Sequence, residues 1–246
     1  MKLKVFTIFI FCLILMSQTA VSQSPLLPWQ NKAAAVVLTY DDALNVDHTN
    51  VIPALDKYGL KGTFYIGNHT VYHPCTGSLP GREFVKPDYD LNNYSIRRIT
   101  DEIKTMNTLL QSIDGKTKRT FAFPCSDTKI RDTPYLDGVK NEFIAARAVR
   151  SEMPTIDKVE IFNLPGYGIN GETGDKLIDL VKQGIAKKAL LIFLFHGVGG
   201  EHSLNVSLEA HAELLQFLKQ HEKEVWVAPM IDVAEYITSY QKKVNS

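Results

Sequence analysis

Short apolar runs alternate with amphipathic segments along most of this 246-residue chain. Six runs are four to six residues long and consist mainly of residues that favour strands: residues 33–38, 62–66, 120–123, 144–149, 190–195 and 225–228. Strands that alternate with helices are typical of a parallel sheet covered by those helices. The pattern therefore predicts an α/β fold.

Five segments have apolar residues at helical spacing. The clearest is 95–113, where Ser95 can cap the first turn and Gly115 can end the helix. The others are residues 50–58, 173–186, 207–222 and 232–240. We expect their apolar stripes to cover the sheet within a single domain over residues 23–246.

The first 22 residues have the layout of a secretory signal. A basic start leads into an apolar run over residues 5–16, followed by small and polar residues over 17–22. The run is short for a membrane span, although a retained anchor is the alternative. We expect cleavage after Ser22, so that an exported, periplasmic or secreted chain begins at Gln23 and keeps no stable membrane span.

Charge and cysteine content limit the partners. The chain has 27 Lys and Arg residues against 27 Asp and Glu residues, which argues against a partner that is a nucleic acid or an anionic membrane. Cys12 lies in the signal, which leaves Cys75 and Cys125. In an oxidising compartment these two can form a disulfide, and two buried free thiols are the alternative.

Polar residues follow several of the predicted strands, where α/β folds place their ligand sites. Asp41 and Asp42 end the first strand, and adjacent side chains on an extended segment point in opposite directions, so one can bind a cation while the other moves a proton. The alternative is a solvated turn. His69 and His73 are four residues apart, which allows both imidazoles to bind one cation. His196 directly follows the most apolar run.

Three segments resemble motifs of one family. Residues 39–43 (Thr-Tyr-Asp-Asp-Ala), 69–73 (His-Thr-Val-Tyr-His) and 194–196 (Leu-Phe-His) are similar to the first, second and fifth motifs of the polysaccharide deacetylase family, the NodB-homology carbohydrate esterases. The resemblance covers most of the chain after residue 22. It implies a distorted (β/α) barrel and a metal-dependent hydrolase that removes N- or O-linked acetyl groups from an acetylated polysaccharide or oligosaccharide.

The resemblance also implies roles for five residues. Asp42, His69 and His73 correspond to the ligands of a divalent metal, zinc in most members. Asp41 corresponds to the general base, and His196 to the group that protonates the leaving amine or alcohol. This assignment agrees with the chemistry, because a cation held by two neutral imidazoles and one carboxylate activates water near neutral pH.

The third family motif is less complete. Pro124 and Cys125 match its turn and are expected to face the oxyanion or the substrate, as is Leu194 of the fifth motif. Ala122 stands where the family has an arginine that orients the base. Arg147 lies inside an apolar run, where a charge is costly without a partner. We therefore expect Arg147 to be the replacement partner of Asp41.

Two further expectations concern the loops. Cys75 follows the second motif and Cys125 lies in the third, so a disulfide would join the metal loop to the oxyanion loop. We expect one β/α segment of the family fold to be absent between Ile66 and Gly67, since too few residues separate that strand from the His pair. The alternatives to an enzyme of this family are a non-catalytic glycan- or metal-binding domain derived from a deacetylase with a truncated barrel, and a different metallohydrolase.

Overall fold

The computed structural model describes residues 27–67 and 69–244. The predicted signal peptide lies outside the described residues. Within them, no helix combines the length and the apolar character that crossing a membrane requires.

The main sheet is parallel throughout. Its strands are β1 (Ala34–Asp41), β2 (Thr63–Tyr65), β7 (Tyr167–Gly168), β8 (Leu190–Phe195) and β11 (Val225–Val227). Strand β1 is central: β8 pairs along its length on one side, while β11 pairs with its first half and β2 with its second half on the other. Strand β7 extends the sheet beyond β8. The predicted parallel pairing is confirmed, and β8 has the expected bounds.

A second parallel pair consists of β3 (Arg119–Ala122) and β6 (Phe143–Arg147). A bridge between Arg147 and Leu164 connects β6 to the segment that leads into β7. The small pairs are β4 (Lys129–Ile130) with β5 (Thr133–Pro134) and β9 (Gly197–Val198) with β10 (Asn205–Val206). The fold is mixed α/β, and the sheets of the described residues do not close on themselves, so the barrel stays a prediction.

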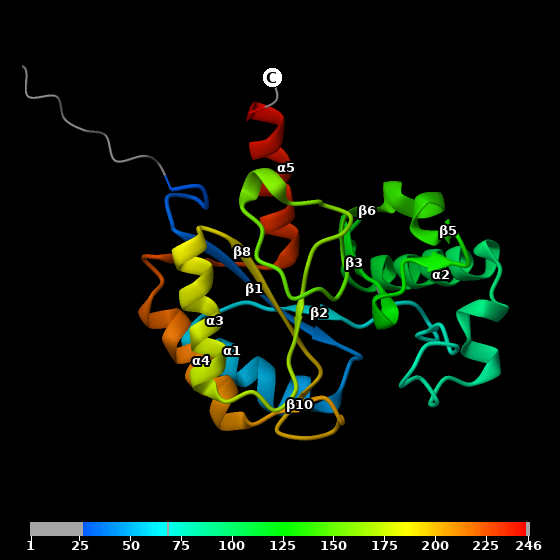
Figure 1. Ribbon diagram of the computed structural model, residues 1–246, viewed down its shortest axis with the longest axis horizontal. Coiled ribbons are helices and arrows are strands. Elements are labelled where there is room, and N and C mark those ends of the chain that lie inside the picture. The colour runs from blue at the N-terminus through cyan, green and yellow to red at the C-terminus, as the bar shows by residue number, and fades with distance from the viewer. Residues whose placement is uncertain (1–26, 68, 245–246) are drawn as a thin grey trace, which may run out of the picture.

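Helices cover both faces of the main sheet (Figure 1). They are α1 (Ile52–Tyr58), α2 (Ile96–Asp114), α3 (Gly174–Lys187), α4 (Leu208–Gln220) and α5 (Met230–Val244). Alternate residues of β1 point to opposite faces, so Val36 and Leu38 pack with α1, α3 and α4, while Ala35 and Val37 pack with α5. Helix α2 covers the second pair through Ile99 and Ile103.

Local sequence explains the ends of α2. The Ser95 hydroxyl accepts a hydrogen bond from the Arg98 backbone N–H at 3.2 Å, and Gly115 adopts a left-handed conformation with φ 68°. The other predicted helices also form, with shifted bounds. A single turn of π-helix, η1 (Asp47–Val51), precedes α1, and α5 is longer than predicted because its apolar face packs on β1 and β6.

The described residues between β2 and α2 contain no α-helix. They form the 3-10 turns η2 (Pro87–Tyr89) and η3 (Leu91–Asn93) and one isolated bridge between Cys75 and Asp90. Further 3-10 turns are η4 (Pro124–Ser126), η5 (Tyr135–Glu142) and η6 (Ile156–Lys158). That a β/α segment is absent relative to the family stays a prediction.

Candidate active site

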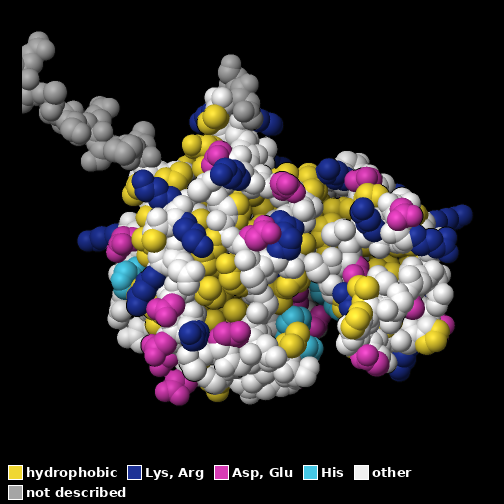
Figure 2. Space-filling model, in the orientation of Figure 1, with side chains coloured by type: hydrophobic (Ala, Val, Ile, Leu, Met, Phe, Trp, Pro, Cys, Tyr) yellow, Lys and Arg dark blue, Asp and Glu magenta, His cyan; other side chains and the backbone are white. Residues whose placement is uncertain are grey.

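Five of the predicted site residues meet at the carboxyl ends of the main strands: Asp41, Asp42, His69, His73 and His196. Asp41 is the last residue of β1, and His196 follows β8, whose Phe195 lies opposite Tyr40 in the register. Strand β2 pairs with the end of β1 and leads into the loop that carries His69 and His73. Figure 2 shows histidine side chains gathered beside a hollow between the larger body and a smaller lobe.

Asp41 and Arg147 form a buried ion pair. The side chains are 1% and 0% exposed, and Nη2 of Arg147 donates to both carboxylate oxygens, at 2.7 and 2.5 Å. The guanidinium also lies 5.2 Å from the centre of the Tyr65 ring. Burial alone would raise the pKa of Asp41, but the charge and hydrogen bonds of Arg147, together with smaller contributions from His69 and His196, outweigh burial and hold this pKa below its usual range. The carboxylate is therefore ionised and fixed in position.

Asp42, His69 and His73 form a group that could hold a metal ion. One ligand atom from each lies within 4.8 Å of the others. The Nε2 atoms of His69 and His73 are 3.0 Å apart. Oδ1 of Asp42 lies 3.8 Å from Nε2 of His69 and 3.7 Å from Nε2 of His73. Nitrogen and oxygen ligands in a tetrahedral zinc site are separated by about 3.4 Å. The spacing therefore fits one cation with little adjustment.

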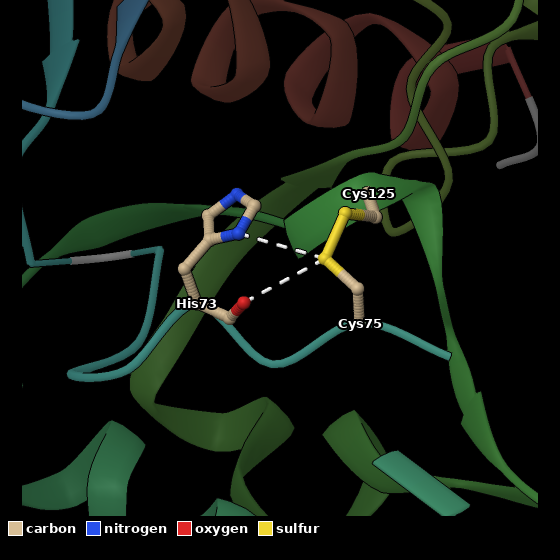
Figure 3. A group of neighbouring side chains, drawn as sticks. All are labelled: His73, Cys75 and Cys125. Carbon is tan, nitrogen blue, oxygen red and sulfur yellow. Dashed lines mark hydrogen bonds between the residues drawn. A yellow bond between two sulfur atoms is a disulfide. The ribbon is translucent and has the colours of Figure 1, made fainter. Parts of the chain in front are cut away.

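Hydrogen bonding fixes the tautomer of His69. Nδ1 of His69 lies 2.8 Å from the Ala122 carbonyl oxygen, which only accepts, so Nδ1 carries the proton and Nε2 keeps its lone pair. Nε2 of His73 lies within hydrogen-bond distance of this Nε2, and Nδ1 of His73 lies 3.5 Å from Sγ of Cys75 (Figure 3). The Ala122 carbonyl therefore orients the His69 ring so that its Nε2 can bind a cation.

Left-handed backbone conformations help to position the three candidate ligands. Asp42 after β1, and Thr70 and His73 in the histidine loop, have φ values of 74°, 65° and 48°. The Thr70 hydroxyl accepts a hydrogen bond from the His73 backbone N–H at 3.1 Å, which closes a tight turn between the two histidines. Burial lowers the pKa of His69 to about 4, so this imidazole is neutral, as a metal ligand must be.

A disulfide between Cys75 and Cys125 joins the loop of His73 to the turn after β3. The Cys75 sulfur lies 3.6 Å from the His73 carbonyl oxygen, so the bridge packs directly against this histidine (Figure 3). Arg82 adds a second connection, because it donates to the Cys125 carbonyl at 2.8 Å and pairs with Asp127. Asp127 in turn accepts from the Thr76 backbone N–H at 2.7 Å. The two loops therefore form one unit.

Comparison with solved structures identifies the fold. A Mycobacterium smegmatis protein assigned to the polysaccharide deacetylases superposes with a TM-score of 0.53 at 13% identity, covering 85% of this chain and 91% of that one. The chain has a polysaccharide deacetylase fold. A peptidoglycan deacetylase from Bacillus subtilis (TM-score 0.47, 11% identity, 86% and 95% covered) and a cobalt-bound family 4 acetyl xylan esterase from Clostridium thermocellum (TM-score 0.46, 20% identity, 83% and 91% covered) are also similar.

Neither the protein-family models nor the curated proteins include one that matches the sequence. The likeness to the deacetylases is therefore one of structure, and the roles of individual residues depend on the geometry of the site.

Pro124, Cys125 and Leu194 are the remaining predicted site residues. Pro124 is buried, and Cys125 has a left-handed φ of 50° in the turn after β3. Leu194 is 2% exposed within β8, and its carbonyl accepts from the Ile169 backbone N–H at 3.0 Å. Arg119 points away from the site and pairs with Asp114, its Nη2 2.6 Å from Oδ1.

A second histidine lies beside His196 and was not recognised in the sequence. The rings of His196 and His202 stack at 4.7 Å, and their Nε2 atoms lie 3.8 and 3.9 Å from Oδ2 of Asp42. Nδ1 of His202 lies 3.0 Å from the Leu204 backbone nitrogen and 3.3 Å from the Leu204 carbonyl oxygen, and Nε2 faces Asp42. The sequence could have indicated His202, because it lies in a glycine-rich loop only six residues after His196, which follows β8.

His196 also carries a buried atom without a partner. No described group hydrogen-bonds to its Nδ1. Burial lowers the pKa of His196, so the ring is neutral and its orientation depends on the stack with His202. The loop of His202 is held in place by Glu201, which accepts from the Val46 backbone N–H at 2.8 Å.

Proposed function

We propose that this protein is an exported, metal-dependent carbohydrate deacetylase that removes N- or O-linked acetyl groups from a polysaccharide or oligosaccharide. The observation that carries the proposal is the convergence of Asp42, His69 and His73 beside the buried Asp41–Arg147 pair. This arrangement combines a ligand set for a divalent cation with an ionised carboxylate that is held in a fixed position.

Asp42, His69 and His73 would hold the cation, most simply Zn²⁺, because two neutral imidazoles and one carboxylate match zinc chemistry. When bound, the cation lowers the pKa of water and polarises the acetyl carbonyl. The tautomer of His69 supports this assignment, since the hydrogen bond from Nδ1 to the Ala122 carbonyl leaves the Nε2 lone pair available.

The chain's own residues would move the protons. Asp41 accepts the proton of the attacking water, while Arg147 keeps the carboxylate ionised and correctly oriented. His196, which is neutral at rest, would first take up a proton and then deliver it to the leaving amine or alcohol, and the proton that Asp41 takes from the attacking water balances this step. His202, whose Nε2 lies 3.9 Å from Oδ2 of Asp42, would add a hydrogen-bonding group to the same centre. The turn that contains Pro124 and Cys125 would face the oxyanion or the substrate, as would Leu194, which is buried within β8 two residues before His196.

The test combines metal content with acetate release. Purified protein is expected to bind about one zinc per chain and to release acetate from chitin oligomers or acetylated xylan. His69→Ala is expected to lose both, and Asp41→Asn is expected to keep zinc and lose acetate release. His48→Ala and Asp56→Asn change exposed residues outside the site and serve as matched controls.

A folded protein with neither zinc nor acetate release would contradict the proposal. It would favour a non-catalytic glycan-binding domain that retains the motifs. Acetate release that survives chelation and His69→Ala would contradict the metal dependence alone.

Export is part of the proposal. The disulfide between Cys75 and Cys125 supports it, because disulfides persist in the periplasm and outside the cell. The intact mass of protein recovered from the periplasm or medium is expected to match a chain that begins at Gln23. Recovery of full-length chain from the cytosol alone would contradict it.

A further inference from the structure

A surface pocket lies between the histidine loop and the first turns of α2, next to the candidate active site. Its volume is about 520 Å³, within the range of small-molecule sites. The lining residues come from two segments, and all are outside the proposed catalytic set: Val71, Tyr72, Ser95, Arg97, Arg98, Asp101, Glu102 and Thr105. Val71 and Tyr72 lie between His69 and His73, so an occupant of this pocket would sit close to the catalytic centre.

The pocket has an exposed aromatic wall. Tyr72 is 51% exposed, and its ring stacks on Tyr89 with centres 5.4 Å apart. Leu79, Phe84 and Tyr89 on the same segment are also exposed. This segment forms the lower part of the smaller lobe in Figure 1, and Figure 2 shows apolar side chains exposed there. A rigid, half-exposed tyrosine offers a flat apolar surface with a polar tip.

Another part of the wall contains a buried carboxylate. Glu102 is 8% exposed, and its polar neighbours are the Tyr94 side chain, the Tyr72 backbone and Arg98. Nε of Arg98 is the nearest charge, 3.5 Å from Oε1. Arg98 is itself held in place, because it stacks on the Tyr94 ring at 3.8 Å and donates to the Asp88 carbonyl at 2.9 Å. Both Glu102 oxygens and the Tyr94 hydroxyl are buried without well-formed hydrogen bonds, so a ligand that supplies such bonds here is favoured.

The charges of the pocket balance. Arg97 pairs with Asp101 at 3.5 Å, as Arg98 does with Glu102. Equal numbers of cations and carboxylates favour neither an anion nor a cation. They favour a neutral ligand with several hydroxyl groups, which donate to carboxylates and accept from guanidinium groups.

We infer that this pocket binds a sugar unit of the glycan substrate, one or more residues away from the unit that is deacetylated. A pyranose ring has an apolar C–H face and a rim of hydroxyl groups, which matches the Tyr72 ring and the charged part of the wall. The inference rests on the proposed function for the identity of the glycan. The inference predicts that the protein prefers longer chains, because only a chain of several sugar units can occupy the pocket and the active site at once.

The experiment measures direct binding by calorimetry, with acetate release measured in parallel. The probes are chitin oligomers and acetylated xylo-oligosaccharides of two and five units. Wild-type protein is expected to bind the pentamer more tightly than the dimer. Tyr72→Ala and Glu102→Leu are each expected to weaken pentamer binding by about tenfold, and Tyr72→Phe is expected to retain it. Ile113→Ala, an exposed change at the far end of α2, is the control.

A folding measurement separates binding from a structural role. Because the Glu102 carboxylate is buried without well-formed hydrogen bonds, Glu102→Leu is expected to leave the midpoint of thermal unfolding unchanged or higher. Loss of pentamer binding together with unimpaired stability supports a ligand-binding role.

The outcomes also distinguish the two proposals. Pentamer binding that is unchanged by Tyr72→Ala and Glu102→Leu overturns the sugar site, even if acetate is released. The same is true if wild-type protein prefers neither length. Pentamer binding that depends on both residues without any acetate release supports the sugar site and overturns the deacetylase.

Discussion

Removal of the Arg147 guanidinium tests the central electrostatic feature of the site. Arg147→Gln leaves the Asp41 carboxylate buried, 1% exposed, without its cationic partner. His69 is the next charge partner, with Nε2 3.7 Å away, but burial disfavours its protonation. Breaking a buried pair by removing one member costs about 3–5 kcal/mol. We expect a loss near the lower end of this range, about 3 kcal/mol at pH 7, because part of the carboxylate charge can be neutralised by protonation.

The pKa of Asp41 determines how the stability cost of Arg147→Gln changes with pH. In the wild-type protein, the pKa of Asp41 lies below its unfolded value, so the pair stabilises the fold above that value and the benefit is lost as the pH falls. In Arg147→Gln, the largest influence that opposes burial is removed, so the pKa of Asp41 rises. The destabilisation should then grow as the pH rises from about 4 towards 8.

Urea unfolding at pH 5 and pH 8, followed by the fluorescence of Trp29 and Trp226, measures both effects. A chelator in every sample removes any contribution from bound metal. The double variant Asp41→Asn/Arg147→Gln closes a thermodynamic cycle, and it should be less destabilised than the sum of the two single variants by about 2 kcal/mol or more. Arg97→Gln, which removes the partner of Asp101 on the exposed face of α2, is the matched surface control and should cost below about 1 kcal/mol.

Two results would refute this reasoning. One is a cost below about 1 kcal/mol for Arg147→Gln, equal to that of the surface control. The other is a cost that is the same at pH 5 and pH 8, which would mean that the Asp41 carboxylate is not the group left without a partner.

Three further changes test other parts of the structure. Burial raises the pKa of Asp47 to about 6, so Asp47→Asn should stabilise the fold by up to about 3 kcal/mol at pH 8 and by nothing near pH 4. Urea unfolding at the two pH values measures this, and an equal effect at both would contradict it. The disulfide spans 50 residues, so replacing Cys75 and Cys125 by alanine should cost up to about 4 kcal/mol of stability and weaken zinc binding. Competition with a chelator measures the zinc affinity, and an unchanged affinity would show that the disulfide does not support the metal loop. A Cβ on Gly197 would collide with the Gly200 carbonyl oxygen, so Gly197→Ala should cost about 1–3 kcal/mol and reduce acetate release, and normal release would argue against a role for this loop.

The framework of the main sheet could be predicted because it depends on local pattern. Strand β8 is apolar at every position and buried on both faces, which its sequence shows directly. The ends of α2 follow from a serine cap and a terminal glycine. The convergence of Asp42, His69 and His73 was also accessible, because strands that pair in parallel place their carboxyl ends together.

The features that were missed depend on contacts between distant segments. Arg82 connects to Asp127 across 45 residues, and nothing near Arg82 in the sequence indicates this partner. His202 reaches Asp42 only because Glu201 binds the backbone of the loop after β1. The pocket beside α2 combines Tyr72 with Glu102 for the same reason. Local periodicity carries no information on such pairs, since each is created when separate elements pack together.

The position of Arg147 shows how an ion pair can move between strands without a change in the fold. Strands β3 and β6 pair in parallel, and their register places Ala122 directly opposite Arg147. Side chains at paired positions point to the same face of a sheet, so an arginine on either strand can reach the same carboxylate. The methyl group of Ala122 leaves space on this face, and Arg147 fills it from the neighbouring strand while it donates to both oxygens of Asp41. The register therefore predicts that Ala122→Arg combined with Arg147→Ala retains the pair, whereas Ala122→Arg alone places two guanidinium groups in one buried space and destabilises the fold.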